Sequence, residues 1–347
     1  MQEQNIIFHR RLIIPQELKE RFPLTPELEA VKLKRDEVIR KILTGEDDRM
    51  LLIIGPCSAD REDAVLDYIT RLARVAEEVS DTIFIVPRVY TNKPRTVGKG
   101  YKGILHQPVP GEAPDLLKGI ITIREMNIRI IRETGFTCAD ELLYPEAYRF
   151  TSDVLSYVAI GARSVEDQEH RLLASGLDIP VGMKNPTSGN LNVMLNAVTA
   201  AQTPQNFIYR NWEVSTKGNP LTHTILRGYE NQNGRTFPNY HYETINELRT
   251  LYEERGLANP AVIIDCNHAN SGKKHREQLR ISKDILHSRR NNSEIRKLVK
   301  GLMIESYLVE GNQPETGGCY GKSITDACIG WEDTERLIHS LAEEWRR

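Results

Sequence analysis

The feature that most constrains the fold of this chain is a repeated alternation of short apolar runs with amphipathic helical patterns. Helical patterns follow most of the runs, and the clearest one covers Asp63–Val79, where apolar residues recur at helical spacing. Continuous apolar strands that alternate with helices indicate a parallel sheet that is buried on both faces. The eight runs are Met50–Gly55, Thr82–Val89, Phe136–Asp140, Val154–Gly161, Ile179–Met183, Leu221–Leu226, Ala261–Asp265 and Gly301–Ile304.

Eight strand–helix units predict an α/β fold of the (β/α)8 TIM-barrel type. Such a barrel takes about 250 residues, and the chain has 347. We therefore assign residues 48–347 to the barrel and residues 1–47 to an N-terminal extension, with a β-hairpin inserted in the barrel. A doubly wound open sheet is the competing architecture for the same pattern.

The extension and the insertion each carry a local signal. Thr25 followed by proline is a good helix start, and Gly45 ends the apolar periodicity of that helix. The apolar face of this helix has to be buried against something. Before the sixth strand, Phe207–Tyr209 and Val214–Ile225 flank Gly218-Asn219, which predicts a hairpin with its turn at that dipeptide.

Composition excludes several classes of partner. Lys plus Arg total 46 against 48 Asp plus Glu, so we expect no nucleic-acid binding through bulk positive charge. The longest uncharged apolar run near the start, Met50–Ile54, is too short to span a membrane. No signal-peptide stretch follows Arg10 and Arg11, and an odd count of five scattered cysteines is typical of reduced thiols. We therefore expect a cytoplasmic protein.

An ionisable residue follows each predicted strand. In a barrel these strand ends converge on one face, where active sites are built. The plainer interpretation is that charges resume wherever a strand meets water, and for any single position it stays open. The residues are Cys57, Arg88, Glu141, Arg163, Lys184, Arg227, His268 and Glu305, with Lys93 and Arg95 close behind Arg88.

Two chemical sets separate when Asp326, on a later loop, is considered with these positions. Cys57, His268, Glu305 and Asp326 are metal-ligand types. One thiol, one imidazole and two carboxylates suit an open catalytic site for Mn, Fe, Co or Zn, although no local spacing supports such a site. Cys57 alone is equally consistent with a small apolar residue at the end of a barrel.

The second set is cationic and predicts small, highly anionic substrates. Arginine forks match phosphate and carboxylate oxygens, and lysine supplies a point charge. An ion pair with a neighbouring carboxylate is the alternative for Arg163 or Arg227 taken alone. The set comprises Arg88, Lys93, Arg95, Arg163, Lys184 and Arg227.

Two stretches imitate nucleotide-binding motifs. Gly98–Gly103 fits G-x-G-x-x-G, but proline-containing sequence follows it where a dinucleotide site needs a helix. Gly321-Lys322-Ser323 ends like a P-loop, but Thr316 stands where that loop needs its first glycine. We therefore disfavour an NAD-dependent dehydrogenase and a P-loop nucleotide site.

Taken in order, nine short motifs resemble DAHP synthase of the class I alpha type, from about residue 25 to the C-terminus. Their joint occurrence in one order is highly specific. They are Ile54–Ser58, Arg88–Thr96, Gly161–Ser164, Gly182–Asn185, Ile225–Gly228, Asn267–Ser271, Met303–Ser306, Gly321–Asp326 and Cys328–Trp331.

The resemblance implies a metal-dependent barrel enzyme that opens the shikimate pathway of aromatic amino acid biosynthesis. It would condense phosphoenolpyruvate with erythrose 4-phosphate. By the same resemblance, the metal ligands are Cys57, His268, Glu305 and Asp326. The phosphoenolpyruvate contacts are Arg88, Lys93, Ala162, Arg163, Lys184 and Arg227, with Glu141 placing a water. Arg95 and Thr96 match the segment that holds the erythrose phosphate. Lys93 is the candidate proton donor. The implied catalytic residues are Lys93, Cys57 and His268.

Two other functions stay open at this stage. One is a related synthase that uses a five-carbon sugar phosphate, and the other is a non-catalytic regulatory barrel. The resemblance also implies a homodimer or homotetramer in which residues 1–24 and the hairpin form subunit contacts, with an aromatic amino acid as effector. At Asp178 and Tyr209 this chain has other residues than its relatives have, and both positions fall where those relatives bind the effector.

Overall fold

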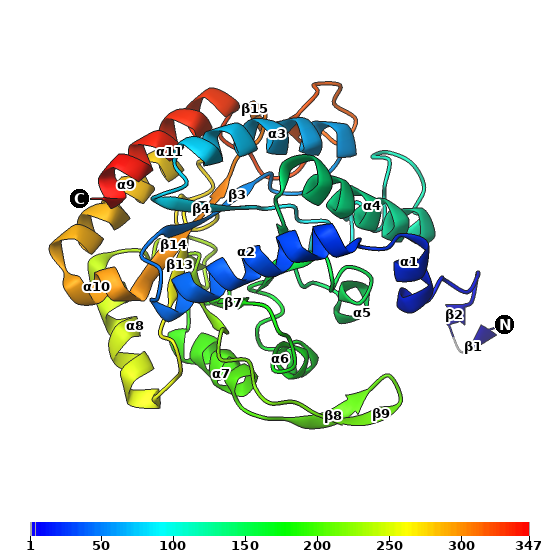
Figure 1. The fold of residues 1–347 in the computed structure, drawn as a ribbon, viewed down its shortest axis with the longest axis horizontal. Helices are drawn as coiled ribbons and strands as arrows, with labels where there is room; N and C mark the ends of the chain where they lie inside the picture. Colours follow the sequence, from blue (N-terminus) through cyan, green and yellow to red (C-terminus); the bar gives the residue numbers. More distant parts are fainter. Residues whose placement is uncertain (1, 4, 347) are drawn as a thin grey trace.

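Eight parallel strands form the centre of the molecule (Figure 1). The computed structural model describes residues 2–3 and 5–346. The strands pair in the order β4-β3-β14-β13-β10-β7-β6-β5, and a parallel bridge between Arg88 and Ala139 joins the two outer strands. The sheet therefore closes into the predicted barrel, and the open doubly wound alternative is wrong. The strands are β3 (Met50–Gly55), β4 (Ile83–Pro87), β5 (Cys138–Glu141), β6 (Leu155–Ile160), β7 (Val181–Lys184), β10 (His223–Leu226), β13 (Val262–Asp265) and β14 (Val299–Glu305).

Helices follow the strands and pack around the barrel (Figure 1). The longer helices match the predicted amphipathic patterns, whereas α5 and α10 are too short to show a period. The helices are α3 (Glu62–Glu78), α4 (Leu116–Thr134), α5 (Pro145–Tyr148), α6 (Gln168–Ala174), α7 (Leu191–Gln202), α8 (Tyr242–Arg255), α9 (Glu277–Asn291), α10 (Ser293–Leu298) and α11 (Trp331–Trp345).

The strands bury both of their faces, as their continuous apolar sequence predicts. In β3, Met50, Leu52 and Ile54 belong to the cluster that includes the buried faces of the helices. Leu51 and Ile53 belong to a second cluster, formed by residues of several strands inside the barrel. This alternation is the period of two that a strand imposes on its side chains.

Helix α2 (Pro26–Thr44) packs against the N-terminal end of the barrel. The Thr25 side chain accepts a hydrogen bond from the amide of Leu28, and Gly45 ends the helix with a positive φ of 82°. Ile42 and Leu43, with Ile39 of the same helix, are buried in the cluster inside the barrel. The predicted helix is thus confirmed, and the extension buries its apolar face within its own chain.

The inserted hairpin is present, but its predicted turn is wrong. Strands β8 (Asn206–Tyr209) and β9 (Trp212–Ser215) pair antiparallel and project from the barrel (Figure 1). Arg210 and Asn211 form the turn with positive φ angles of 52° and 62°. An arginine gives no sequence signal for such a two-residue turn, which favours Asn or Gly. Gly218-Asn219 instead lies on the path to β10.

Short pieces complete the chain. Helix α1 (Pro15–Arg21) precedes α2, and β1 (Gln2–Glu3) pairs with β2 (Ile6–Ile7). Strands β11 (Tyr229–Glu230) with β12 (Thr236–Phe237) follow β10, and β15 (Val309–Asn312) with β16 (Lys322–Ser323) follow β14. Within the described residues, every helix is too short or too polar to cross a membrane.

Candidate active site

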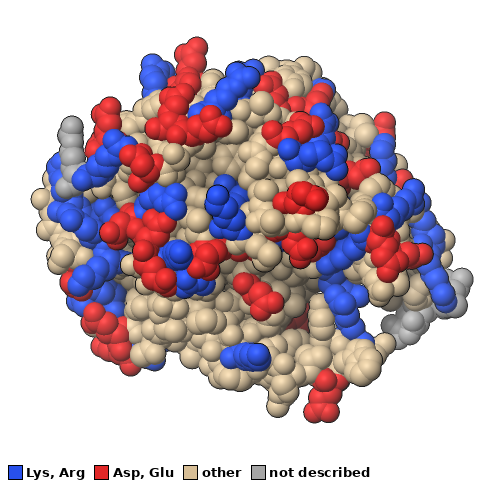
Figure 2. Space-filling model, viewed as in Figure 1, with Lys and Arg blue, Asp and Glu red and all other residues tan. Residues whose placement is uncertain are grey.

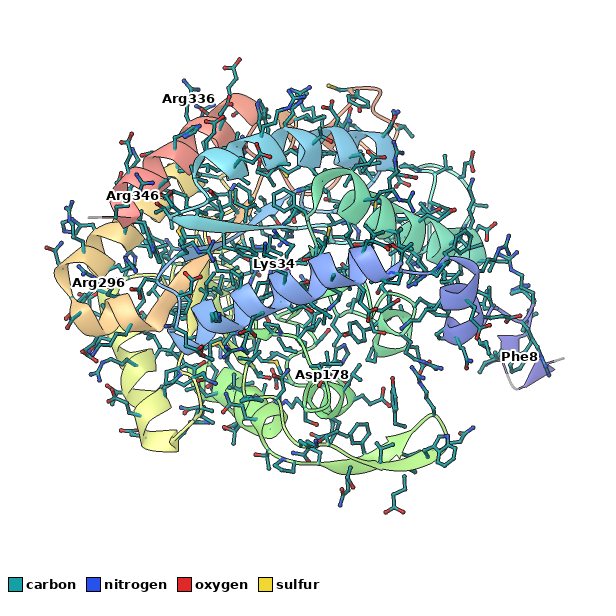
Figure 3. The ribbon with its side chains drawn as sticks, in the orientation of Figure 1. Phe8, Lys34, Asp178, Arg296, Arg336 and Arg346 are labelled. Atoms are coloured by element: carbon teal, nitrogen blue, oxygen red, sulfur yellow. The ribbon has the colours of Figure 1, made fainter. Side chains whose placement is uncertain are left out.

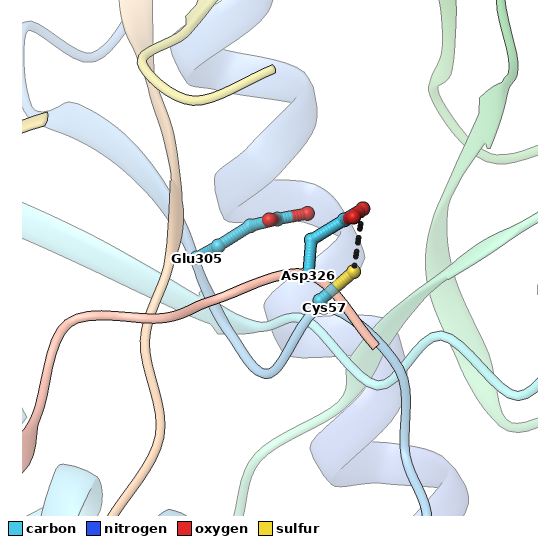
Figure 4. Close-up of side chains that lie close together, drawn as sticks. All are labelled: Cys57, Glu305 and Asp326. Carbon is cyan, nitrogen blue, oxygen red and sulfur yellow. Dashed lines mark hydrogen bonds between the residues drawn. The ribbon is translucent and has the colours of Figure 1, made fainter. Parts of the chain in front are cut away.

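Three potential metal ligands meet at the mouth of the barrel, by which we mean the C-terminal strand ends with their loops (Figure 4). Parallel pairing places Glu305 opposite Gly55, two residues before Cys57. The loop after β16 brings Asp326 to the same point. One ligand atom from each of the three side chains lies within 4.8 Å of the others. Three of the four residues in the predicted metal-ligand set are therefore neighbours, although they lie far apart in sequence, and His268 is not in this group.

Lys93 contacts this cluster directly. Its Nζ donates to Sγ of Cys57 at 2.7 Å and to Oδ2 of Asp326 at 2.8 Å. Burial alone would lower the pKa of Lys93, but the negative groups of the cluster raise it well above the usual range. Lys93 in turn holds the pKa of Asp326 far below its ordinary value. The lysine is therefore a fixed ammonium donor at neutral pH.

Cys57 is fully buried in a charged setting. Burial, followed by the nearby Glu305 carboxylate, raises the pKa of its thiol to about 12. Its Sγ also lies 3.4 Å from Oδ2 of Asp326. The side chain thus faces polar groups of the mouth, in addition to filling space at the barrel end. A thiol in this state ligates an ion only after it loses its proton.

His268 is held beside the cluster by a strained backbone and a buried carboxylate. Its φ of 53° is unusual for a residue other than glycine. Nε2 lies 3.6 Å from Oε1 of Glu305, and Nδ1 lies 2.8 Å from Oδ2 of Asp265, although without hydrogen-bond geometry. Asp265 also accepts a hydrogen bond from Nζ of Lys184 at 3.0 Å. One buried carboxylate therefore positions two of the predicted site residues.

Arg88 is buried and held from several sides. It donates to Oε1 of Glu305 at 2.7 Å, and its guanidinium carbon lies 3.6 Å from the ring centroid of Tyr90. It also donates to the backbone carbonyl of Cys57 at 3.2 Å. The guanidinium is thus fixed beside the proposed metal ligands. Such fixed placement suits a group that binds a substrate anion close to a metal ion.

Arg163 and Arg227 are cations without an ion pair in the described part of the chain. Within residues 2–3 and 5–346, neither arginine has a carboxylate oxygen inside 4.0 Å, so the ion-pair alternative for them is wrong. Nη1 of Arg227 is buried, and no described residue forms a hydrogen bond with it. Burial, with the nearby charge of Arg163, lowers the pKa of Arg227. Such a pair of cations favours an anionic ligand.

The other predicted residues line the same mouth at greater exposure. Glu141 ends β5, and its Oε1 lies so close to Gly161 that a Cβ there would meet it at 2.2 Å. Ala162 is half-buried next to it. On the loop after β4, Nε of Arg95 donates to the carbonyl of Tyr101 at 2.8 Å, and Thr96 is exposed. This loop places Arg95 at the rim rather than within the ligand cluster.

Comparison with known proteins gives this arrangement a family. Residues 22–339 match the family model described as the DAHP synthetase I family.

The chain belongs to the DAHP synthetase I family.

Relatives span nearly the whole chain. The Phe-sensitive phospho-2-dehydro-3-deoxyheptonate aldolase of Escherichia coli K12 is 40% identical over 342 residues, covering 96% of this chain and 94% of the relative. The Trp-sensitive protein of Escherichia coli O157:H7 is 39% identical, covering 95% of this chain and 94% of that protein. A solved phospho-2-dehydro-3-deoxyheptonate aldolase from Francisella tularensis SCHU S4 superimposes with a TM-score of 0.91 at 33% identity, covering 99% of both chains. The family resemblance drawn from the motifs is confirmed.

The donor set of this DAHP synthetase I family member fits a borderline divalent ion. Cys57, Glu305 and Asp326 supply one sulfur and two carboxylate donors. The buried Nδ1 of His268 faces Asp265 but has no hydrogen-bond partner within the described residues, and Nε2 is turned toward Glu305. A carboxylate behind a histidine is the usual support of a ligating imidazole. Mixed sulfur, nitrogen and oxygen donors suit Mn, Fe, Co or Zn.

Sequence reasoning missed the supporting residues of the site. Asp265 ends β13 and joins His268 to Lys184, and Asn267 donates to Oε2 of Glu305 at 2.5 Å. Tyr90 lies beneath the guanidinium of Arg88. The sequence signal for Asp265 is a charged residue at the C-terminal end of an apolar run. The sequence does not tell which side chains this residue will contact.

Proposed function

We propose that this chain condenses phosphoenolpyruvate with erythrose 4-phosphate to give DAHP and phosphate, using a divalent metal ion. This is the first step of the shikimate pathway. The observation that carries the proposal is the meeting of Cys57, Glu305 and Asp326 with Lys93 and Arg88 at the barrel mouth. The names of the relatives, phospho-2-dehydro-3-deoxyheptonate aldolases, support it.

The cations of the mouth suit phosphoenolpyruvate, which carries about three negative charges near neutral pH. Arg163 and Arg227 have no carboxylate partner among the described residues, and we assign them to the phosphate group together with Lys184. Arg88 and Lys93, next to the ligand cluster, suit the carboxylate end. Ala162 contributes backbone beside Arg163. Bidentate arginine contacts fix the orientation of such a ligand as well as its affinity.

The proposed reaction uses two protein groups, Lys93 and Glu141. C3 of phosphoenolpyruvate attacks the aldehyde carbon, and Nζ of Lys93 gives a proton to the oxygen that becomes an alkoxide. Glu141 positions the water that adds at C2. One proton of this water restores the charge of Lys93, and the other leaves with phosphate as the C2–O bond breaks and the keto group forms. A divalent ion held by Cys57, His268, Glu305 and Asp326 would supply Lewis acidity toward the aldehyde oxygen.

The second substrate reaches the site past the loop after β4. Arg95 is held there by Tyr101, and the exposed Thr96 follows it. A guanidinium and a hydroxyl at the rim suit the terminal phosphate of a short sugar. We therefore favour the four-carbon sugar over a five-carbon one, since the rim residues belong to the segment that matches the family.

Phosphate release from phosphoenolpyruvate tests the proposal. We expect release that depends on erythrose 4-phosphate and a seven-carbon keto acid phosphate as product. Release that depends on a five-carbon sugar phosphate instead would identify the related synthase. No release with either sugar, in protein loaded with metal, would support the non-catalytic barrel.

We also propose a homo-oligomer with feedback control by an aromatic amino acid. The N-terminal arm exposes Ile6, Ile7 and Phe8, and the hairpin exposes Ile208 at 82% and Trp212 at 73%. Exposed apolar side chains concentrated on two projecting segments are typical of subunit contacts. Relatives named Phe-, Tyr- and Trp-sensitive support an aromatic effector.

Phe or Tyr is the proposed effector, although two side chains work against it. Asp178 would repel the carboxylate of an amino acid, and Tyr209 adds bulk on the hairpin. Steady-state assays with millimolar Phe, Tyr and Trp on the full chain and on a chain that starts at Thr25 test the regulation. No inhibition of the full chain by any of them rejects it, and a monomer in sedimentation rejects the oligomer.

A further inference from the structure

A basic cleft of about 670 Å³ lies at the N-terminal end of the barrel, on the opposite side from the mouth. It opens between the starts of β3, β4 and β14 and the ends of α9 and α11. Figure 2 shows Lys and Arg side chains gathered at the edge where Figure 1 places α9, α10 and the C-terminus. The residues that carry the argument are Arg49, Arg289, Arg296, Lys300, Trp345 and Arg346.

The cations of the basic cleft fall into two groups. Arg49 pairs with Asp47 at 2.6 Å, and Arg346 pairs with Asp81 at 2.5 Å. Arg289, Arg296 and Lys300 form no ion pair within 4.0 Å in the described part of the chain. Arg296 and Arg346 lie on the same side of the molecule in Figure 3. Three positive charges thus line one hollow, and none of them has a carboxylate oxygen within 4.0 Å in residues 2–3 and 5–346.

Arg289 is held in place rather than free in solvent. Its guanidinium carbon lies 3.3 Å from the ring centroid of Trp345, whose Nε1 donates to the carbonyl of Asp48 at 2.8 Å. Nε of Arg289 is buried and has no hydrogen-bond partner among the residues that the structure describes. An arginine already ordered by stacking loses less conformational entropy when it binds an anion.

The charges of the basic cleft also oppose one another. Burial, and then the charge of Arg296, lowers the pKa of Arg289 to about 10. Burial also lowers the pKa of Lys300. The exposed Asp48 carboxylate raises the pKa of Lys300 and of Arg289, whereas the charge of Arg289 lowers that of Lys300 further. An anion bound among these groups would offset both their mutual repulsion and their desolvation.

We propose that the basic cleft is a binding site for a small metabolite with two or more phosphate charges, separate from the mouth. Arginine forks match phosphate oxygens, and the volume exceeds what a single phosphate fills. Helix α9 ends beside the cleft, and cations in a last turn also stabilise the helix dipole. Stabilisation of the helix dipole does not explain why Nε of Arg289 is buried without a partner among the described residues. It also does not explain Lys300, which lies on β14 and not on the helix.

Calorimetric titration of the full chain with inorganic pyrophosphate tests the proposal. The cleft variant is Arg289→Gln with Lys300→Gln, and the surface control is Arg336→Gln, an exposed arginine paired with Asp333. We expect wild type and control to bind alike and the cleft variant to bind at least about tenfold more weakly. The charge-retaining pair Arg289→Lys with Lys300→Arg should bind pyrophosphate more tightly than the cleft variant does, which separates loss of charge from misfolding.

A variant of the mouth separates this site from catalysis. Arg227→Ala should leave pyrophosphate binding to the cleft in place. Unchanged binding by the cleft variant, or binding that disappears only in Arg227→Ala, would overturn the proposal. The titration needs no turnover, so failure of the proposed condensation would leave its result unaffected.

Discussion

The two ends of the barrel interior differ in their side chains, which are largely charged at the mouth and largely apolar at the N-terminal end. At the mouth, Arg88, Lys184 and Glu305 are buried and charged, and His268 has a strained backbone. At the N-terminal end, Ile42 and Leu43 of α2, with the interior residues of the strands, form an apolar cluster. Buried charge costs free energy, whereas apolar burial supplies it. The difference teaches that one end stabilises the fold while the other holds strained, charged groups ready for a ligand.

If the mouth is catalytic, Lys93→Met should have the largest effect on activity of all the substitutions considered. Loss of the proton donor should lower kcat by at least about a hundredfold, with metal content retained because the four proposed ligands remain. Steady-state assays and metal analysis measure this, with Lys283→Met on the outer surface of α9 as control. Near-normal turnover by a variant that binds both substrates would remove Lys93 from the proton transfer.

Leu43→Ala probes the opposite end. This buried side chain fills the barrel interior from α2, so its truncation should lower the free energy of unfolding by about 2–5 kcal/mol. The matched control on the same helix is Leu33→Ala, which is 60% exposed and should change stability by less than about 0.5 kcal/mol. Urea denaturation measures both. A Leu43→Ala protein of normal stability with altered substrate KM values would contradict the division between the two ends.

His223 gives the N-terminal end a pH dependence that does not involve catalysis. The imidazole is buried inside the barrel, where Nε2 lies 2.7 Å from Oη of Tyr157 and Nδ1 lies 2.9 Å from the carbonyl of Leu221. Burial lowers its pKa from 6.5 to about 4. The unfolded chain therefore takes up a proton at a higher pH than the folded chain does. The resulting stability is complete above pH 6.5 and is lost as the pH falls through about 4.

This loss should amount to about 3 kcal/mol, at about 1.4 kcal/mol per pKa unit. Denaturation curves between pH 7 and 4 measure it. His223→Gln should flatten this part of the profile, whereas the exposed control His339→Gln should not. An unchanged slope in His223→Gln would show that other groups control acid unfolding.

Arg227→Ala sharpens the comparison from the side of substrate binding. Truncation of a buried cation leaves the phosphoenolpyruvate phosphate partly unpaired, which costs at least about 2 kcal/mol or about 30-fold in affinity. Stability should change little, because Arg227 forms no ion pair among the described residues. The KM for phosphoenolpyruvate measures the effect against Arg336→Ala. An unchanged KM would remove Arg227 from the site.

Most of the barrel could be predicted because its signals are local. Short apolar runs and helical periods such as Asp63–Val79 follow directly from the two-sided burial of each strand. The hairpin turn could not be placed, because Arg210 adopts a positive φ that its residue type does not announce. The closure of the barrel interior by α2 also escaped the sequence, since an apolar face does not name its partner.

The site shows the same limit. Strand ends identify Cys57 and Glu305 because the fold brings such ends together, and Asp326 joins them in the metal-ligand set by its residue type. The roles of Asp265 and Tyr90 depend on distances across the mouth, such as the 3.6 Å between Arg88 and the Tyr90 ring. Sequence alone also left Arg227 between an ion pair and a ligand contact. The structure excludes only the ion pair, because no carboxylate oxygen of the described residues lies within 4.0 Å of Arg227.

Metal removal followed by metal return tests the central claim most directly. Phosphate release from phosphoenolpyruvate, with and without erythrose 4-phosphate, is measured before chelation, after chelation and after addition of Mn, Co or Fe. We predict that chelation abolishes the sugar-dependent release, that the added ion restores it, and that Cys57→Ser needs a higher ion concentration because its hydroxyl is far harder to deprotonate than a thiol. Full turnover by verified metal-free protein would contradict the account.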